Sequence, residues 1–336
     1  MQDKINSIQL LRVILTVLVI LDHYAPSYVT QFLLPGSHLF FVIGGFFLYF
    51  VALRAKEHKT SIIQYMKKRW ARIIPPAFAV LVIALFMGLL QIEDMPAYLT
   101  LTHQVVFDVT NVTPFWYISA FFWSQVIVFA ILTAFRPTLA LIILGTIGLI
   151  SVIILFQHEA LWVWQGHIFG FLNPGLLRGL FGLTLGVTAA VIVQKRGIKS
   201  AKKPYLGVLE IALLIAFIAS YMSGPYIVWS GTNYQILLLT NVLIFVPLMI
   251  LFVQSKGWIS AFLNRQAVFE KIAIYAYPAF ISQEVMVHPF HGKFDLPGWL
   301  ECVFIVAAPF LFAVVYVHLI EPGAKFCWKQ FRSKIY

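Results

Sequence analysis

The chain has 336 residues, of which 61% are hydrophobic and only 11% are charged, and its mean hydropathy is +0.88. Soluble domains carry about 25% charged residues, so this composition excludes a soluble globular protein and predicts one embedded in a bilayer. Membrane spans of about 20 residues each take up nearly the whole chain and leave no room for a separate soluble domain.

Ten apolar runs follow one another, separated by charged or turn-forming residues. Each is long enough to cross a bilayer as a helix, because backbone groups in lipid must satisfy one another. The runs are residues 8–27, 36–53, 73–91, 114–135, 138–156, 168–194, 205–222, 234–254, 272–288 and 298–320. The amphiphilic stretch 92–113 predicts a short lid or interfacial helix. We therefore predict an all-α polytopic membrane bundle of about ten helices, forming one domain over residues 1–336.

The distribution of Lys and Arg favours one orientation of this bundle. With the N-terminus inside, the inner connections hold nearly all the basic residues: Arg54, Lys56, Lys59, Lys67, Lys68, Arg69, Arg72, Arg136, Lys195, Arg196, Lys199, Lys202, Lys203, Lys256, Arg265, Lys271, Lys325, Lys329, Arg332 and Lys334. The outer ones hold Lys293 with Glu93, Asp94, Asp108, Glu159 and Asp295. The positive-inside rule then predicts that both termini are cytoplasmic. The net charge of +11 thus favours anionic lipid as a partner rather than nucleic acid.

Ionisable residues inside the first run are the clearest functional signal, because each is costly to insert in a membrane. Arg12 and His23 are eleven positions apart, which returns to nearly the same helix face about 16 Å further along. Asp22 points elsewhere, so it is a poor candidate for orienting His23. A membrane histidine can equally be a packed or snorkelling group, but Arg12 on the same face favours a functional role. Other runs are marked by Arg178, Glu210 and Glu301.

Polar and aromatic residues elsewhere extend this pattern. Gln283 and Glu284 lie in the ninth run at a depth like that of His23, although Glu284 can also be a structural partner for an intramembrane cation. Trp116 and Tyr117 can stack on sugars, but an aromatic belt at the membrane interface explains them equally.

A basic cluster precedes the third run. Lys67, Lys68, Arg69 and Arg72 stand directly before Ile73-Ile74-Pro75, and we expect them to cap the cytoplasmic start of the helix. Taken alone, such a cluster is typical of a topology determinant. Four cations at one helix end also suit an anion site.

The order of these features resembles the acyltransferase-3 family of membrane O-acyltransferases. Five stretches carry the resemblance: Arg12 and His23 with ten residues between them, His38 to Phe46, Arg69 to Pro75, Phe115 to Ser119, and Arg178 to Gly186. Two positions depart from the family pattern. Gly44 stands where the family usually has Ser, and Gln283 stands where many members have His. Neither departure touches the Arg12–His23 pair, which the family treats as essential.

The resemblance implies an enzyme that transfers an acyl group, commonly acetyl, from cytoplasmic acyl-coenzyme A to a carbohydrate. We expect His23 and Arg12 to be the catalytic residues, with His23 as the base. Arg12, Arg69, Arg72 and Lys68 are the expected residues for the coenzyme phosphates. The expected substrate-binding residues are Gln283, Glu284, Trp116 and Tyr117, with an envelope carbohydrate or glycolipid as acceptor and no metal.

Other functions remain open from the residues alone. A flippase or exporter of a lipid-linked sugar suits intramembrane charges and outer aromatic residues equally well, although no inverted repeat or paired broken spans favour it. A sensor or scaffold has no specific support. In each case we expect a multi-pass protein of a bacterial cytoplasmic membrane, and the oligomeric state is undetermined.

Overall fold

The structure, a computed structural model, describes residues 5–25, 36–107, 109, 112, 114–161, 166–196, 204–222, 231–290 and 297–323. Within these ranges the extended regular elements are helices, and nine of them are long and apolar enough to cross a membrane. These are α1 (Asn6–Tyr24), α3 (Ser37–Glu57), α4 (Ile62–Phe86), α6 (Phe115–Ala134), α7 (Pro137–Gln157), α8 (Pro174–Arg196), α9 (Pro204–Tyr221), α11 (Gly231–Gln254) and α15 (Gly298–Val315), which the π-helical turn η2 (Tyr316–Ile320) extends. The predicted all-α polytopic bundle is confirmed.

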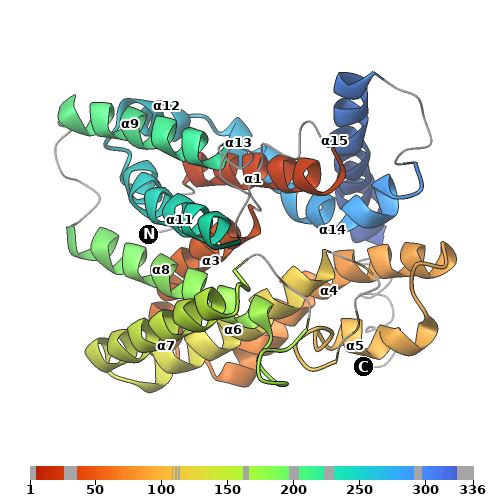
Figure 1. Cartoon of the computed structure of the whole chain (residues 1–336), viewed down its shortest axis with the longest axis horizontal. Coiled ribbons are helices and arrows are strands. Elements are labelled where there is room, and N and C mark those ends of the chain that lie inside the picture. The colour runs from red at the N-terminus through yellow and green to blue at the C-terminus, as the bar shows by residue number, and fades with distance from the viewer. Residues whose placement is uncertain are drawn as a thin grey trace.

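The helices pack around α8, which contacts α3, α6, α7 and α11. Figure 1 shows α6, α7 and α8 together at the lower left, with α9, α11 and α12 (Trp258–Leu263) at the upper left. Toward the right, α14 (Ala276–Val287) contacts α1, α4 and α15. The polar residues expected in the site come mainly from α1, α4, α6 and α14.

Two glycines bring α3 and α8 into backbone contact. A Cβ atom on Gly45 would overlap the Leu183 carbonyl group, and one on Gly186 would overlap the carbonyl oxygen of Val42. Small residues allow this close approach between membrane helices. A larger side chain at either position would therefore push α3 away from α8.

The ninth predicted run, 272–288, is a broken helix. It consists of α13 (Val268–Ala273) and α14, joined through Ile274 and Tyr275. Pro278 explains the break, because proline has no N–H and its ring clashes with the carbonyl group four residues earlier, here that of Ile274. Neither piece is long enough to cross a membrane alone.

The chain nevertheless follows α1 along its whole length, from Asn264 at the end of α12 through α13 and α14. At the start of α1 the Asn6 side-chain amide donates to the Asn264 carbonyl oxygen at 3.1 Å. At its end the Tyr24 hydroxyl donates to the Glu284 carboxylate at 2.6 Å. The rise of α1 between these two contacts is about 27 Å, close to the roughly 30 Å hydrocarbon thickness of a bilayer. The segment from Asn264 to Glu284 therefore runs parallel to α1 over a length close to that of a membrane span.

Helix α4 begins at Ile62 rather than at residue 73. Ser61 and Gln64 form a capping box: the Gln64 N–H donates to Ser61 Oγ at 3.2 Å, and the Ser61 N–H donates to Gln64 Oε1 at 3.1 Å. The basic residues 67–72 therefore lie inside α4, and the prediction that they cap its start was wrong. Lys and Arg are good helix formers, so the helix extends well beyond its hydrophobic part.

The connection between α4 and α6 folds back against both helices. It contains η1 (Ile92–Asp94) and α5 (Met95–Leu99), which confirms the short helix expected within 92–113. The Trp70 indole donates to the Leu99 carbonyl oxygen at 2.8 Å, and the Trp123 indole donates to that of Leu101 at 2.7 Å. This connection therefore covers part of the α4–α6 interface.

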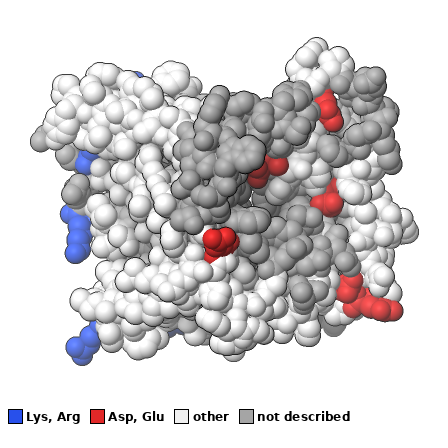
Figure 2. All heavy atoms as spheres, viewed as in Figure 1, with Lys and Arg blue, Asp and Glu red and all other residues white. Residues whose placement is uncertain are grey.

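Basic and acidic residues lie in different parts of the molecular surface. On the face drawn in Figure 2, Lys and Arg lie at the left end, and Asp and Glu lie in the middle and toward the right. The positive-inside rule produces such a separation. The cytoplasmic placement of both termini stays a prediction, since the charges at 197–203, 291–296 and 324–336 lie outside the described residues.

Candidate active site

The His23 side chain meets α14 at the end of α1. His23 Nδ1 lies 3.3 Å from the side-chain oxygen of Gln283. With its hydrogen on Nδ1, the imidazole donates to Gln283, and the lone pair on Nε2 has no partner among the described residues. His23 is exposed, whereas Gln283 is fully buried. The arrangement therefore orients an accessible ring as a proton acceptor.

The amide nitrogen of Gln283 is a second available group. It is buried and has no hydrogen-bond partner within the described part of the chain. A buried donor without an acceptor is unfavourable, so this N–H group is suited to an oxygen of a bound ligand. Asp22 has no part in this arrangement, because the ring of His23 interacts with Gln283 and Glu284.

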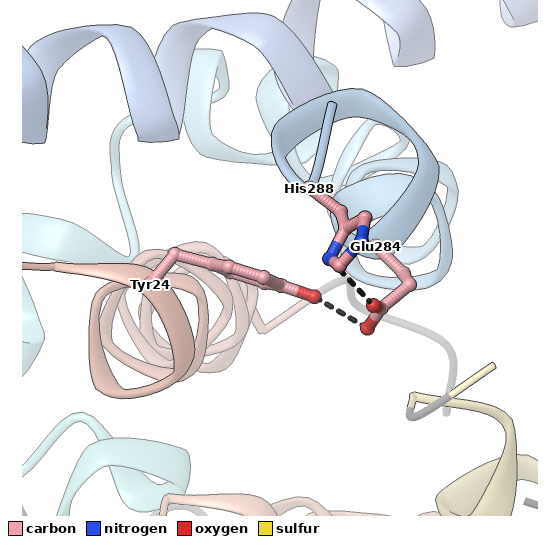
Figure 3. Close-up of polar contacts among 3 residues, drawn as sticks. All are labelled: Tyr24, Glu284 and His288. Carbon is pink, nitrogen blue, oxygen red and sulfur yellow. Dashed lines mark hydrogen bonds and ion pairs between the residues drawn. The ribbon is translucent and has the colours of Figure 1, made fainter. Parts of the chain in front are cut away.

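Glu284 joins α1 to α14 through Tyr24, and Figure 3 shows these two residues together with His288. One carboxylate oxygen accepts the Tyr24 hydroxyl at 2.6 Å, and the other lies 3.6 Å from His288 Nδ1 one turn further along α14. The predicted structural role of Glu284 and its predicted contact with substrate are compatible, because a carboxylate can accept more than two hydrogen bonds.

Three arginines gather at the opposite end of this face of α1. Arg12 lies within electrostatic range of Arg69 and Arg72, which are one turn apart in α4. The Arg12 guanidinium donates to Gln9 Oε1 at 2.9 Å. Arg69 donates from Nε to Gln125 Oε1 at 2.8 Å and also reaches that oxygen from Nη2.

The arginine cluster, Arg12, Arg69 and Arg72, has no acidic counterpart among the residues that the structure describes. Like charges at short range repel one another, so a bound anion would stabilise the cluster. Planar guanidinium groups match the geometry of phosphate and carboxylate oxygens. The cluster therefore has the chemistry needed to bind an anion.

The remaining predicted residues divide between this cluster and the protein interior. Tyr117 interacts electrostatically with Arg12 and so lies beside the arginine cluster. Trp116 is buried, and the guanidinium of Arg178 lies 4.4 Å from the centre of its ring. Lys68 is exposed and is not among the charges that act on Arg12. Stacking on a sugar is thus not supported for Trp116 by its position.

Sequence reasoning missed two residues of the site. Gln125 orients Arg69 from inside α6, and the Tyr277 hydroxyl donates to the Ile73 carbonyl oxygen at 3.0 Å. Gln125 is a polar residue inside the fourth apolar run, which could have marked it as a site residue. It was missed because only ionisable residues in the runs were considered. Tyr277 stands in the same stretch as Gln283, but its contact with α4 depends on how the two helices pack.

His103, in the connection after α5, is a buried titratable group outside the membrane spans. Its ring stacks on Tyr98 with 4.4 Å between ring centres, and its Nε2 donates to the Phe115 carbonyl oxygen at 2.8 Å. Burial lowers the pKa of His103 to about 4, against the smaller opposing effect of its backbone hydrogen bonds. The residue is therefore neutral at physiological pH.

The structure thus places an imidazole held by Gln283 and a cluster suited to anions at two depths of one bundle. Such an arrangement suits an enzyme that moves a group from an anionic carrier to an acceptor. The family model of the acyltransferase-3 family, an acyltransferase domain, matches residues 5–318. The chain belongs to this family and is a membrane acyltransferase. Searches of curated proteins and of solved structures each found no match.

Proposed function

We propose that this acyltransferase moves an acyl group, most simply acetyl, from cytoplasmic acyl-coenzyme A to a hydroxyl of an envelope or exported carbohydrate or glycolipid. The observation that supports this best is the shared face of α1, where Arg12 joins the arginine cluster and Gln283 orients His23. The two α1 residues are about 16 Å apart along the helix, a separation comparable with an extended pantetheine arm. This distance fits an acyl-coenzyme A whose phosphates lie at Arg12 and whose thioester lies at His23.

At the donor end, the arginine cluster binds the coenzyme phosphates. Guanidinium forks make two parallel hydrogen bonds to a phosphate, which a lysine ammonium does not. Gln125 holds Arg69 from α6, so part of the cluster is positioned before the donor binds. Lys68 adds charge from the exposed side of α4.

At the acceptor end, His23 Nε2 removes the proton of the acceptor hydroxyl. The hydroxyl oxygen attacks the thioester carbonyl carbon, the carbon–sulfur bond breaks, and the proton passes from His23 to the departing thiolate. General base catalysis contributes about 10²–10⁴-fold. The unpaired amide N–H of Gln283 donates to the carbonyl oxygen as negative charge develops there. Glu284 accepts a hydrogen bond from another hydroxyl of the acceptor.

The setting of this reaction is a multi-pass protein of a bacterial cytoplasmic membrane, in contact with membrane lipids. The donor enters from the cytoplasm and the acceptor from the opposite face. No metal and no nucleic acid takes part in the proposed reaction.

The break between α13 and α14 gives one observation in favour of the alternative, a flippase for lipid-linked sugars. Broken helices at the binding site are common in secondary transporters, and Tyr277 lies directly after this break, beside the arginine cluster. A flippase has no use for acyl-coenzyme A. Binding of acyl-coenzyme A by the purified protein therefore separates the two functions.

The direct test is transfer of radiolabelled acetyl from acetyl-coenzyme A to cell-envelope glycans by purified protein. We expect transfer by the wild-type protein and none by a folded His23→Ala variant. The matched control is His288→Ala, which removes an exposed histidine of α14 beside the same site. Wild-type turnover by His23→Ala would contradict the base assignment, and absence of donor binding by the wild-type protein would favour the flippase.

A further inference from the structure

Three aromatic rings from three helices meet inside the bundle. Phe40 of α3, Tyr117 of α6 and Phe280 of α14 contact one another pairwise, with ring centres 6.1 Å (Phe40–Tyr117), 6.0 Å (Phe40–Phe280) and 5.3 Å (Tyr117–Phe280) apart. All three pairs are edge-on, with interplanar angles of 61°, 63° and 69°. Each of the three rings therefore contacts the other two.

On α14, this trio lies between the two ends of the site. Tyr277, three residues before Phe280, binds the α4 backbone beside Arg72. Gln283, three residues after Phe280, contacts His23. Three residues along a helix rise about 4.5 Å, so Phe280 is midway between the donor end and the acceptor end.

The position of Tyr117 agrees with this placement. Tyr117 interacts electrostatically with Arg12 and Arg69, which puts its ring next to the donor end. Tyr117 and Phe280 are only 7% and 5% exposed. The contact between the two rings leaves little room for water at this level of the bundle.

We propose that Phe40, Tyr117 and Phe280 form an aromatic constriction between the arginine cluster and His23, and that it admits only uncharged acyl groups. The inference rests on the proposed function, because a donor held by its phosphates at the arginine cluster must pass its acyl end between these rings to reach the base. An acetyl or propionyl group enters such surroundings readily. A succinyl group carries a carboxylate, and taking an unpaired charge out of water is strongly unfavourable.

The inference names the donor class: neutral acyl-coenzyme A and not a dicarboxylic one. For the wild-type protein we expect kcat/KM with acetyl-coenzyme A to exceed that with succinyl-coenzyme A by at least about 100-fold. The coenzyme is the same in both donors, so the difference arises after the phosphates have bound. It should therefore appear in kcat more than in the Kd of the intact donor.

Widening the constriction tests its role. Phe280→Ala removes one ring and lets water accompany the carboxylate, so we expect the ratio of acetyl to succinyl use to fall about tenfold. Phe40→Leu, at a partly buried ring, is the milder variant should Phe280→Ala fold poorly. The matched control is Phe217→Ala, which removes a buried ring that contacts Tyr221 and Phe245 between α9 and α11. It should leave the ratio unchanged.

The outcomes separate the two claims. Succinyl use within tenfold of acetyl use by the wild-type protein overturns the constriction while leaving the proposed function intact. The constriction is also overturned if both folded variants, or the single one that folds, keep the wild-type ratio. No transfer from any acyl-coenzyme A overturns the proposed function and the constriction together.

Discussion

The imidazole of His23 and the side-chain amide of Gln283 lie 3.3 Å apart, although 260 positions separate them in the chain. This contact joins the first helix to the second half of a broken one. It decides which ring nitrogen of His23 can accept a proton, and it leaves the amide nitrogen of Gln283 without a partner among the described residues. The two helices therefore need to keep their register for the base to be aligned.

Replacement of Gln283 by leucine should lower kcat about 100-fold while leaving the KM for acyl-coenzyme A nearly unchanged. The substitution removes both the hydrogen-bond acceptor that orients His23 and the amide N–H group, whereas the proposed site for the coenzyme phosphates lies elsewhere. Gln283→His should keep more activity, because an imidazole nitrogen can accept the His23 Nδ1 hydrogen. Steady-state kinetics on both variants checks this. The control is Ser282→Ala, whose hydroxyl donates to the Ala279 carbonyl oxygen of its own helix; an equal loss in that variant would point to a packing defect.

Arg69→Lys should raise the KM for acetyl-coenzyme A about tenfold with little change in kcat. A lysine ammonium cannot reproduce the two guanidinium contacts to Gln125 or a fork to phosphate. Acetyl-pantetheine, which lacks the nucleotide phosphates, should show no such increase. Lys67→Ala, at an exposed position of the same helix, serves as the control. An equal rise in KM for both donors would place Arg69 outside the phosphate site.

Most of the fold could be predicted from hydropathy, because lipid forces every span to be an apolar helix. The run 138–156 matches α7 almost residue for residue. Hydropathy could not predict the start of α4 or the break before α14. They depend on a capping box at Ser61 and on the ring of Pro278, which are local features that hydropathy does not record.

The candidate site was predictable where one helix sets the geometry. The shared face of Arg12 and His23 follows from helix periodicity alone. Their partners, Gln125 for the arginine cluster and Gln283 for the base, depend on how separate helices pack. The same reason explains why Trp116, which the sequence suggests for sugar binding, proves to be buried against Arg178.

Glu210 of α9 is a buried carboxylate with a structural explanation. It accepts the backbone N–H groups of Ile259 and Ser260 at 2.8 and 3.1 Å, and so caps the start of α12. Glu210→Ala leaves the buried Ser260 N–H and the partly buried Ile259 N–H without this acceptor and should destabilise the protein by about 1–3 kcal/mol. Thermal unfolding in detergent measures the loss, and the KM for the donor should not change. Glu210→Gln keeps one acceptor oxygen and should lose less; equal Tm values for all three proteins would contradict the capping role.

The last prediction concerns pH. Burial lowers the pKa of His103 to about 4, whereas the unfolded chain has the ordinary histidine pKa of about 6.5. Between these values the unfolded state binds more protons than the folded state, so stability decreases as pH falls from about 6.5 to about 4. The full loss from this residue is about 3 kcal/mol.

His103→Gln should reduce this acid sensitivity, because its amide can donate to the Phe115 carbonyl oxygen and does not titrate. The measurement is Tm in detergent at a series of pH values for the variant and the wild-type protein. His158→Gln, which removes an exposed histidine in the turn after α7, is the control and should follow the wild-type profile. Parallel profiles for His103→Gln and the wild-type protein would mean that His103 is not held neutral in the fold. A flatter acid profile for His103→Gln alone would show that this connection depends on a neutral imidazole between Tyr98 and Phe115.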